Sequence, residues 1–256
     1  MTKSNNWTRE EILVALNVYC KIPFKTSRAT NPIVMEYAQI LGRSSAALNL
    51  KIGNIGSFDD NLKKQGITGL SHGSKLDEKV WNEFIDNPDK IIFESEQIIA
   101  KLKNQSIEQV AAIDLNSLPQ GTDVFSVVKT RINQTFFRKA VLTSYNNQCC
   151  VSGVSNPELL EACHITPWNE DVKNRTNPKN GLCMNVFFHK AFDKYLFTVT
   201  PDYNIEISDK ILDNVKSDSF RQYLLRINGK SIILPHKFLP DVELLEKHYQ
   251  IYKSNL

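Results

Sequence analysis

The stretch of sequence that decides the fold runs from Glu161 to Asp193 and reads EACHITPWNEDVKNRTNPKNGLCMNVFFHKAFD. Two histidines stand in it, His164 and His189, with Asn180 between them. His189 and Asp193 are four residues apart, so on a helix their side chains project from one face. An imidazole and a carboxylate placed in this way can share one divalent cation. The stretch therefore predicts a site for a metal ion.

The segments around these residues predict how they are positioned. LLEACHI is an extended, mostly apolar run that ends just before Pro167, which is typical of a strand. A polar loop follows, and FFHKAFD then has the pattern of a helix. A strand that delivers His164, and a helix that delivers His189 and Asp193, suit metal-assisted hydrolysis of a phosphodiester.

The same stretch resembles the HNH nuclease motif of the ββα-metal fold. In that family the Asn is followed nine residues later by a metal-binding His, and a further ligand stands four residues beyond. Asn180 and His189 have this spacing, and Asp193 occupies the last ligand position. The approach segment FRKAVLTSYNNQCCVSGVSNPELLEACHITPW also resembles one HNH subfamily often assigned to restriction enzymes. The resemblance covers roughly residues 131–197.

The resemblance implies a role for each of these residues. His164 would be the general base, and Asn180 would hold the loop and orient the His164 ring. His189 and Asp193 would bind one divalent ion, with Mg²⁺ expected and Mn²⁺ or another transition metal as alternatives. Cys163 stands where many members of the family carry a metal-binding Asp or His, so it is a candidate ligand that the sequence leaves open.

Many HNH proteins also carry two CxxC pairs around a structural zinc. Here Cys149 and Cys150 have no partner pair, and Asn185 and Phe188 stand where the second pair would be. No structural zinc is therefore expected. Buried thiols are the expected state of these cysteines and of Cys183.

The whole chain has the pattern of an α+β protein. Residues 1–110 are expected to form a helical, helix-turn-helix-like DNA-recognition domain, 111–121 a linker, and 122–256 the HNH nuclease domain. Thr8 and Glu11 have the capping-box spacing of a helix start. After the metal-binding helix, apolar residues alternate on both sides of a Pro-Asp turn, which predicts an extra hairpin, and a final helix follows near the C-terminus.

Two predicted helices, at residues 32–41 and from residue 44, are separated by a short turn that contains Gly42. This is the pattern of a helix-turn-helix, in which the polar residues of the second helix contact DNA. A small helical bundle that serves docking or dimerisation is the alternative. The residues expected to contact DNA are Arg43, Ser45, Asn49, Lys51 and Asn54.

The net charge of +3 does not by itself predict a nucleic-acid partner. The distribution of charge is more informative, because no acidic residue lies between Asp123 and Glu158. A basic surface beside a phosphodiesterase site favours phosphate binding, although a solvated helix face has the same pattern. The expected phosphate contacts are Arg131 and Arg138 in this segment, and Lys173, Arg175 and Lys179 in the polar loop.

No apolar run approaches the ~20 residues of a membrane span, and the first residues, MTKSNNWTREE, lack the apolar region of a signal peptide. The five cysteines lack the spacing of a disulfide framework, which favours a reducing cytoplasm. No membrane partner is therefore expected.

The sequence predicts a metal-dependent DNA endonuclease of restriction type, acting on double-stranded DNA as a homodimer. Its N-terminal domain would select a sequence or a modified base. A DNA-binding regulator with a decayed nuclease site is the alternative, and a nuclease that cuts RNA is a third possibility.

Overall fold

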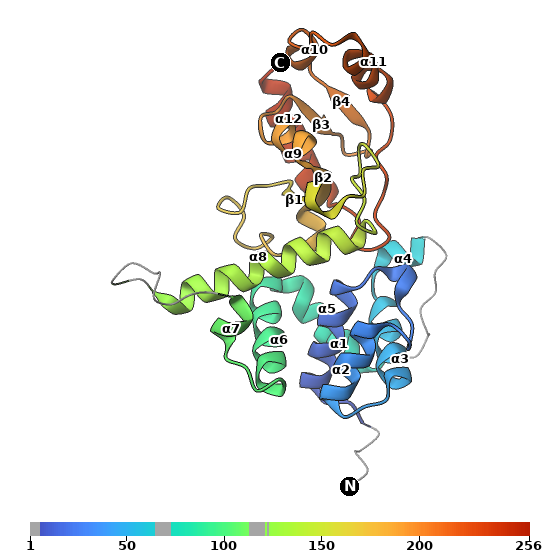
Figure 1. Ribbon diagram of the computed structural model, residues 1–256, viewed down its shortest axis with the longest axis vertical. Helices are drawn as coiled ribbons and strands as arrows, with labels where there is room; N and C mark the ends of the chain where they lie inside the picture. The colour runs from blue at the N-terminus through green and yellow to red at the C-terminus, as the bar shows by residue number, and fades with distance from the viewer. Residues whose placement is uncertain (1–5, 65–72, 113–120, 122) are drawn as a thin grey trace. The chain divides into compact units, whose positions relative to one another are not determined.

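The computed structural model describes residues 6–64, 73–112, 121 and 123–256. The chain divides into two compact units, Met1–Thr143 and Ser144–Leu256. Helices form the first unit, and the second contains two small antiparallel sheets together with helices (Figure 1). The expected α+β class is confirmed. Among the described residues, no helix is long and apolar enough to cross a membrane.

The helical unit is built around α1 (Arg9–Lys21), in which every residue from Glu11 to Cys20 is buried. Four helices pack around α1 (Figure 1): α2 (Pro32–Leu41), α3 (Ser45–Gly56), α5 (Lys75–Asp86) and α6 (Pro88–Leu102). Three shorter elements, η1 (Phe24–Thr26), α4 (Asp60–Lys64) and α7 (Ile107–Ala111), complete the set with the long α8 (Val124–Ser144).

Local signals set the boundaries of the first helices. The Thr8 hydroxyl accepts a hydrogen bond from the Glu11 backbone N–H at 3.2 Å, and the Glu11 carboxylate accepts one from the Thr8 N–H at 3.0 Å. This is the predicted capping box. α2 ends at Gly42, whose φ of 63° lies in the left-handed region, and Ser44 caps α3. The predicted helix–turn–helix spacing is therefore present.

The long helix α8 was expected to open the nuclease domain, but it packs with the helical unit. The amide of Asn133 donates to the Asp89 carboxylate of α6 at 2.7 Å. Buried apolar residues of α6, α7 and α8 form one cluster, consisting of Phe93, Ala111, Val128 and Ile132. The division between the compact units therefore falls at 143/144 in the sequence. A linker was expected at 111–121, of which 113–120 lie outside the described residues.

The second unit contains the predicted ββα arrangement. β1 (Leu160–His164) pairs antiparallel with β2 (Gly181–Asn185), and His164 lies opposite Gly181. α9 (Val186–Asp193) follows β2 directly and packs on both strands. The Asn185 side chain accepts a hydrogen bond from the backbone N–H of Phe188 at 3.0 Å, which caps the helix and fixes where it begins.

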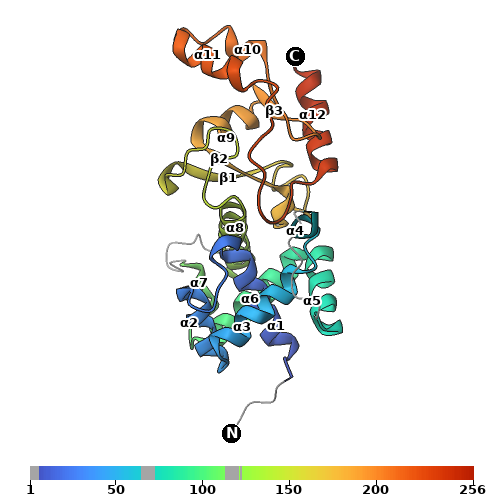
Figure 2. The same cartoon turned by 90° about the vertical axis from the view of Figure 1, so that its right-hand side faces the viewer.

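The rest of this unit supports the ββα core. β3 (Phe197–Val199) and β4 (Ile205–Ile207) form the predicted extra hairpin, and α12 (Val242–Ser254) is the predicted final helix. Figure 2 shows α12 beside β3, on which it packs. The remaining elements are η3 (Pro157–Leu159), η4 (Pro178–Asn180), α10 (Asp209–Leu212) and α11 (Asp218–Ile227).

Candidate catalytic and metal site

One pocket of the second unit brings together three of the residues that the motif singled out. It has a volume of about 320 Å³ and lies at the junction of β1, α9 and α12. His164, His189 and Asp193 line it, together with Trp168 and His248. Side chains that lie far apart in the sequence, from Ala162 to His248, therefore face one cavity.

Three potential metal ligands converge beside this pocket. The Cys163 sulfur, a ring nitrogen of His189 and a carboxylate oxygen of Asp193 all lie within 4.8 Å of one another. His189 Nε2 lies 3.6 Å from Asp193 Oδ2, as the spacing of four residues on a helix predicts. Within the described part of the chain, no other group of three or more His, Cys, Asp or Glu side chains has such an arrangement. The donor set fits a divalent cation.

Glu161 on β1 orients His189. Its Oε2 lies 2.5 Å from His189 Nδ1. A carboxylate that accepts from Nδ1 fixes the imidazole tautomer in which Nε2 is free of hydrogen, and Nε2 is the atom that faces Asp193. The sequence interpretation missed this residue. The available signal was strand alternation, which places Glu161 on the same face of β1 as Cys163.

His164 is held by the backbone of the polar loop. Its Nε2 lies 2.8 Å from the carbonyl oxygen of Arg175. Since a carbonyl only accepts, Nε2 carries the hydrogen and Nδ1 is the basic atom of the ring. Burial lowers the pKa of His164 below its ordinary value of 6.5, so the ring is neutral at pH 7. The edge of the Trp168 ring packs against it, with ring centroids 5.7 Å apart.

Asn180 fixes the same loop from within. Its side chain is fully buried. Its Oδ1 accepts a hydrogen bond from the Thr166 N–H at 2.9 Å, and its Nδ2 donates to the Thr166 carbonyl at 3.0 Å and the Asn174 carbonyl at 3.3 Å. Asn174 precedes Arg175, whose carbonyl holds the His164 ring. The contacts of Asn180 therefore reach the predicted base through the loop backbone.

His248 of α12 closes one side of the pocket. Its ring stacks on Phe192, with centroids 3.6 Å apart, and its Nδ1 lies 2.9 Å from the Thr198 hydroxyl. Burial lowers the pKa of His248 from 6.5 to about 4. No local pattern in the sequence indicates that His248 packs against α9, the helix that carries His189 and Asp193.

Burial and the nearby carboxylates of Asp193 and Glu161 raise the pKa of the Cys163 thiol well above its ordinary value of 9.0. Cys149, Cys150 and Cys183 are also buried. The thiol of Cys163 differs from these because it faces the carboxylate and imidazole of α9.

The basic residues expected to bind phosphate fall into two sets. Lys173, Arg175 and Lys179 belong to the loop between β1 and β2, where Lys173 is exposed and the Arg175 guanidinium lies 5.1 Å from the Trp168 ring centre. Arg131 and Arg138 are exposed on α8, which packs with the helical unit. Phosphate contact by all five stays a prediction.

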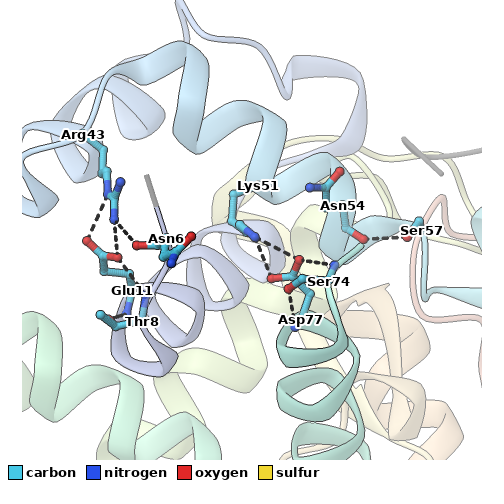
Figure 3. Close-up of polar contacts among 9 residues, drawn as sticks. All are labelled: Asn6, Thr8, Glu11, Arg43, Lys51, Asn54, Ser57, Ser74 and Asp77. Carbon is cyan, nitrogen blue, oxygen red and sulfur yellow. Dashed lines mark hydrogen bonds and ion pairs between the residues drawn. The ribbon is translucent and has the colours of Figure 1, made fainter. Parts of the chain in front are cut away.

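Arg43, in the turn before α3, and Lys51 of α3 both form ion pairs within the helical unit (Figure 3). Arg43 Nη2 lies 2.7 Å from Glu11 Oε2, and its side chain is 10% exposed. Lys51 is 6% exposed, and its ammonium lies 2.8 and 2.9 Å from the two carboxylate oxygens of Asp77. The expectation that Arg43 and Lys51 contact DNA is therefore not supported, because carboxylates of the same unit neutralise both charges.

The remaining polar residues of α3 are half-buried. The Asn49 Oδ1 accepts a hydrogen bond from the Ser27 hydroxyl at 3.4 Å. The Asn54 Oδ1 is buried and has no hydrogen-bond partner among the described residues, so this oxygen is not placed for contact with a base, and DNA contact by Asn54 stays a prediction. DNA contact by Ser45 and Asn49 stays a prediction.

Comparison with known proteins agrees with this geometry. Residues 149–200 match the model of a family described as HNH endonuclease. This segment contains the predicted base and all three potential metal ligands, so the chain carries an HNH endonuclease domain, and the expected family is confirmed. The match supports a nuclease of the hydrolase class. A search of curated proteins found no match.

Proposed function

We propose that this protein is a metal-dependent DNA endonuclease of restriction type, in which the HNH domain cuts DNA that the helical unit helps to select. One observation carries the proposal: the neutral His164 imidazole and the ligands His189 and Asp193 line the same pocket. A base and a metal site that share one pocket are what phosphodiester hydrolysis requires.

In this mechanism, His164 accepts a proton from the attacking water at Nδ1. The hydrogen bond from Nε2 to the Arg175 carbonyl keeps the ring in place during the transfer. A positioned general base contributes typically about 10²–10⁴-fold to a rate. Asn180 preserves the loop geometry on which this position depends.

His189 and Asp193 would hold the divalent ion, and Glu161 directs Nε2 of His189 toward Asp193. When bound, such an ion acts as a Lewis acid that stabilises negative charge on the phosphate and the leaving oxygen. Lys173 and Arg175 lie on the loop that holds His164, so they are our candidates for contact with the DNA backbone.

For the helical unit, the support is the α2–Gly42–α3 spacing. Since Arg43 and Lys51 form ion pairs with carboxylates of their own unit, we propose that other residues contact the DNA. Ser27 binds Asn49 of α3, and the same segment carries the exposed side chains of Lys25 and Arg28. This edge of α3 combines amide and cationic groups, which contact bases and phosphates respectively.

The deciding experiment is cleavage of two phage DNAs, one unmodified and one cytosine-modified, with Mg²⁺, Mn²⁺ or EDTA. Discrete metal-dependent bands from one DNA, which disappear when His164 is changed to Ala, are the expected result. Retained DNA binding without cleavage of either DNA under any metal would favour the regulator with a decayed site. Cleavage of RNA in preference to duplex DNA would also contradict the proposal.

A further inference from the structure

The ligand set beside the pocket has a composition that favours one kind of metal. We propose that Cys163 is the third protein ligand, and that its thiolate makes this centre a site for a transition-metal ion of the Zn²⁺ or Co²⁺ type instead of Mg²⁺. The inference rests on the proposed metal-dependent function and names the chemistry of its metal. It replaces the sequence-based expectation of Mg²⁺ and answers the question that the sequence left open for Cys163.

The first argument is position. Glu161 and Cys163 alternate with Ala162 along β1, so strand geometry directs both toward one face. Glu161 contacts Nδ1 of His189, while the Cys163 sulfur lies within 4.8 Å of the ligand atoms of His189 and Asp193. β1 thus supplies both Glu161, which orients the His189 ring, and Cys163, a third potential metal ligand.

The second argument is distance. A tetrahedral zinc ion has bonds of about 2.0–2.3 Å to nitrogen, oxygen and sulfur, which place neighbouring ligand atoms roughly 3–4 Å apart. The 3.6 Å between His189 Nε2 and Asp193 Oδ2 lies within this range, and the 4.8 Å limit for the whole set leaves only a small adjustment.

The third argument is ligand preference. Mg²⁺ demands oxygen donors in octahedral geometry and keeps much of its water, so sulfur is a poor ligand for it. Thiolate and imidazole select zinc and related transition metals, while a carboxylate serves either class. Catalytic zinc sites use three protein ligands and keep one position open for water or substrate. Cys163, His189 and Asp193 are three such ligands beside an open pocket.

The fourth argument is charge. The Asp193 carboxylate lies within 4.8 Å of the Cys163 sulfur, and His189 lies beside both Asp193 and a second carboxylate, that of Glu161. A divalent cation at the centre compensates the thiolate and the carboxylates together. A buried thiol that serves packing alone has no need of this surrounding. Cys183 on β2 is equally buried but is not part of the ligand group.

The test is Co²⁺ titration of the metal-free, full-length protein, followed by near-ultraviolet absorption. Thiolate coordination to Co²⁺ produces a charge-transfer band that nitrogen and oxygen ligands do not produce. We expect the band to saturate at one equivalent in the wild type and in the control variant Cys183→Ala, and to be lost in Cys163→Ala. A band that persists in Cys163→Ala, or is absent from the wild type, overturns the inference.

Competition with Zn²⁺ gives the size of the effect. Loss of a residue that only hydrogen-bonds to a metal ligand weakens metal binding by about 10–100-fold. Cys163→Ala removes a ligand itself and should weaken Zn²⁺ binding by more than this. Its Mg²⁺ affinity should stay unchanged. If Cys163→Ala does not fold, X-ray absorption of the wild type with one equivalent of Zn²⁺ decides: one sulfur at about 2.3 Å supports the inference, and only nitrogen and oxygen neighbours refute it.

The outcomes separate this inference from the proposed function. DNA cleavage with Mg²⁺ by a protein that shows no sulfur–metal bond would leave the nuclease proposal standing and remove the thiolate site. A sulfur–metal bond in a protein that cuts no DNA with any metal would establish the site and remove the proposed function.

Discussion

The two units use their polar residues in opposite ways. We call the second unit, Ser144–Leu256, the HNH unit. Its residues His164, His189 and Asp193 were identified from the sequence motif, and all three face one pocket. In the helical unit, Arg43 and Lys51 were also identified by position on a motif, yet both are bound to carboxylates of their own unit. The same kind of argument therefore agrees with the side-chain geometry in one region and not in the other, while the roles of all these residues stay predictions.

The difference lies in what each pattern constrains. The spacing of His189 and Asp193 fixes two side chains on one helix face, whatever the surroundings. The helix-turn-helix pattern fixes the path of the backbone but not which face of α3 meets water. Lys51 points to Asp77, 26 positions away, and no local rule reveals that pairing. A buried cation needs such a partner, so a basic residue on a helix is weak evidence for DNA contact.

The largest effect that would test this comparison is loss of catalysis in the HNH unit. His164→Ala should lower the cleavage rate by about 10²–10⁴-fold, because the general base is removed while the metal ligands remain. The measurement is single-turnover cleavage of duplex DNA at saturating metal. His236→Ala is the matched control, since this histidine belongs to the same unit but does not line the pocket. Equal cleavage rates for His164→Ala and wild type would contradict the prediction that His164 is the general base.

The second effect concerns the helical unit. Lys51→Met removes the partner of the buried Asp77 carboxylate, and breaking a buried pair costs about 3–5 kcal/mol of unfolding free energy. Urea denaturation measures the loss. Lys63→Met is the control, because its pair with Asp60 is exposed and such pairs contribute about 0–1 kcal/mol. A variant of Lys51 that keeps wild-type stability but loses DNA affinity would restore Lys51 as a contact residue.

The third effect separates Glu161 from other acidic residues near β1. Glu161→Gln should weaken metal binding by about 10–100-fold, since the carboxylate that fixes the His189 tautomer is lost. Calorimetric titration with the metal gives the change, and Glu158→Gln, at an exposed position of η3, is the control. If both variants bind metal as the wild type does, Glu161 has no orienting role.

The sequence predicts local patterns better than contacts between residues that are distant along the chain. Capping at Thr8, the turn at Gly42 and the spacing of His189 and Asp193 are local patterns, and the structure contains the cap, the turn and the neighbouring pair of side chains. The roles of the residues in the 164–193 motif stay predictions. Glu161 was missed because its role arises only where β1 meets α9, and a glutamate on a strand otherwise resembles any solvated one. The packing of α8 differs from the expectation for a related reason, since Asp89, which holds it, lies 44 positions before Asn133.

The smallest effect comes from His248, outside the segment that matches the HNH family. Its pKa in the folded protein is about 4, against 6.5 for an ordinary histidine, so the unfolded chain binds more protons between these values. The stability contributed by neutral His248 is full above about pH 6.5 and is lost as the pH falls toward about 4. Between about pH 7.5 and pH 5.5 the loss should be about 1.4 kcal/mol, by linkage.

Urea denaturation of the wild type and His248→Phe at these two pH values isolates the contribution, because Phe retains the stacking on Phe192 and cannot be protonated. The wild type should lose more stability than the variant by this amount. Since α12 presses His248 against the helix of the metal ligands, DNA cleavage by the wild type should fall in the same pH range under destabilising urea. If the unfolding free energies of wild type and His248→Phe depend on pH in the same way, protonation of His248 does not destabilise the protein.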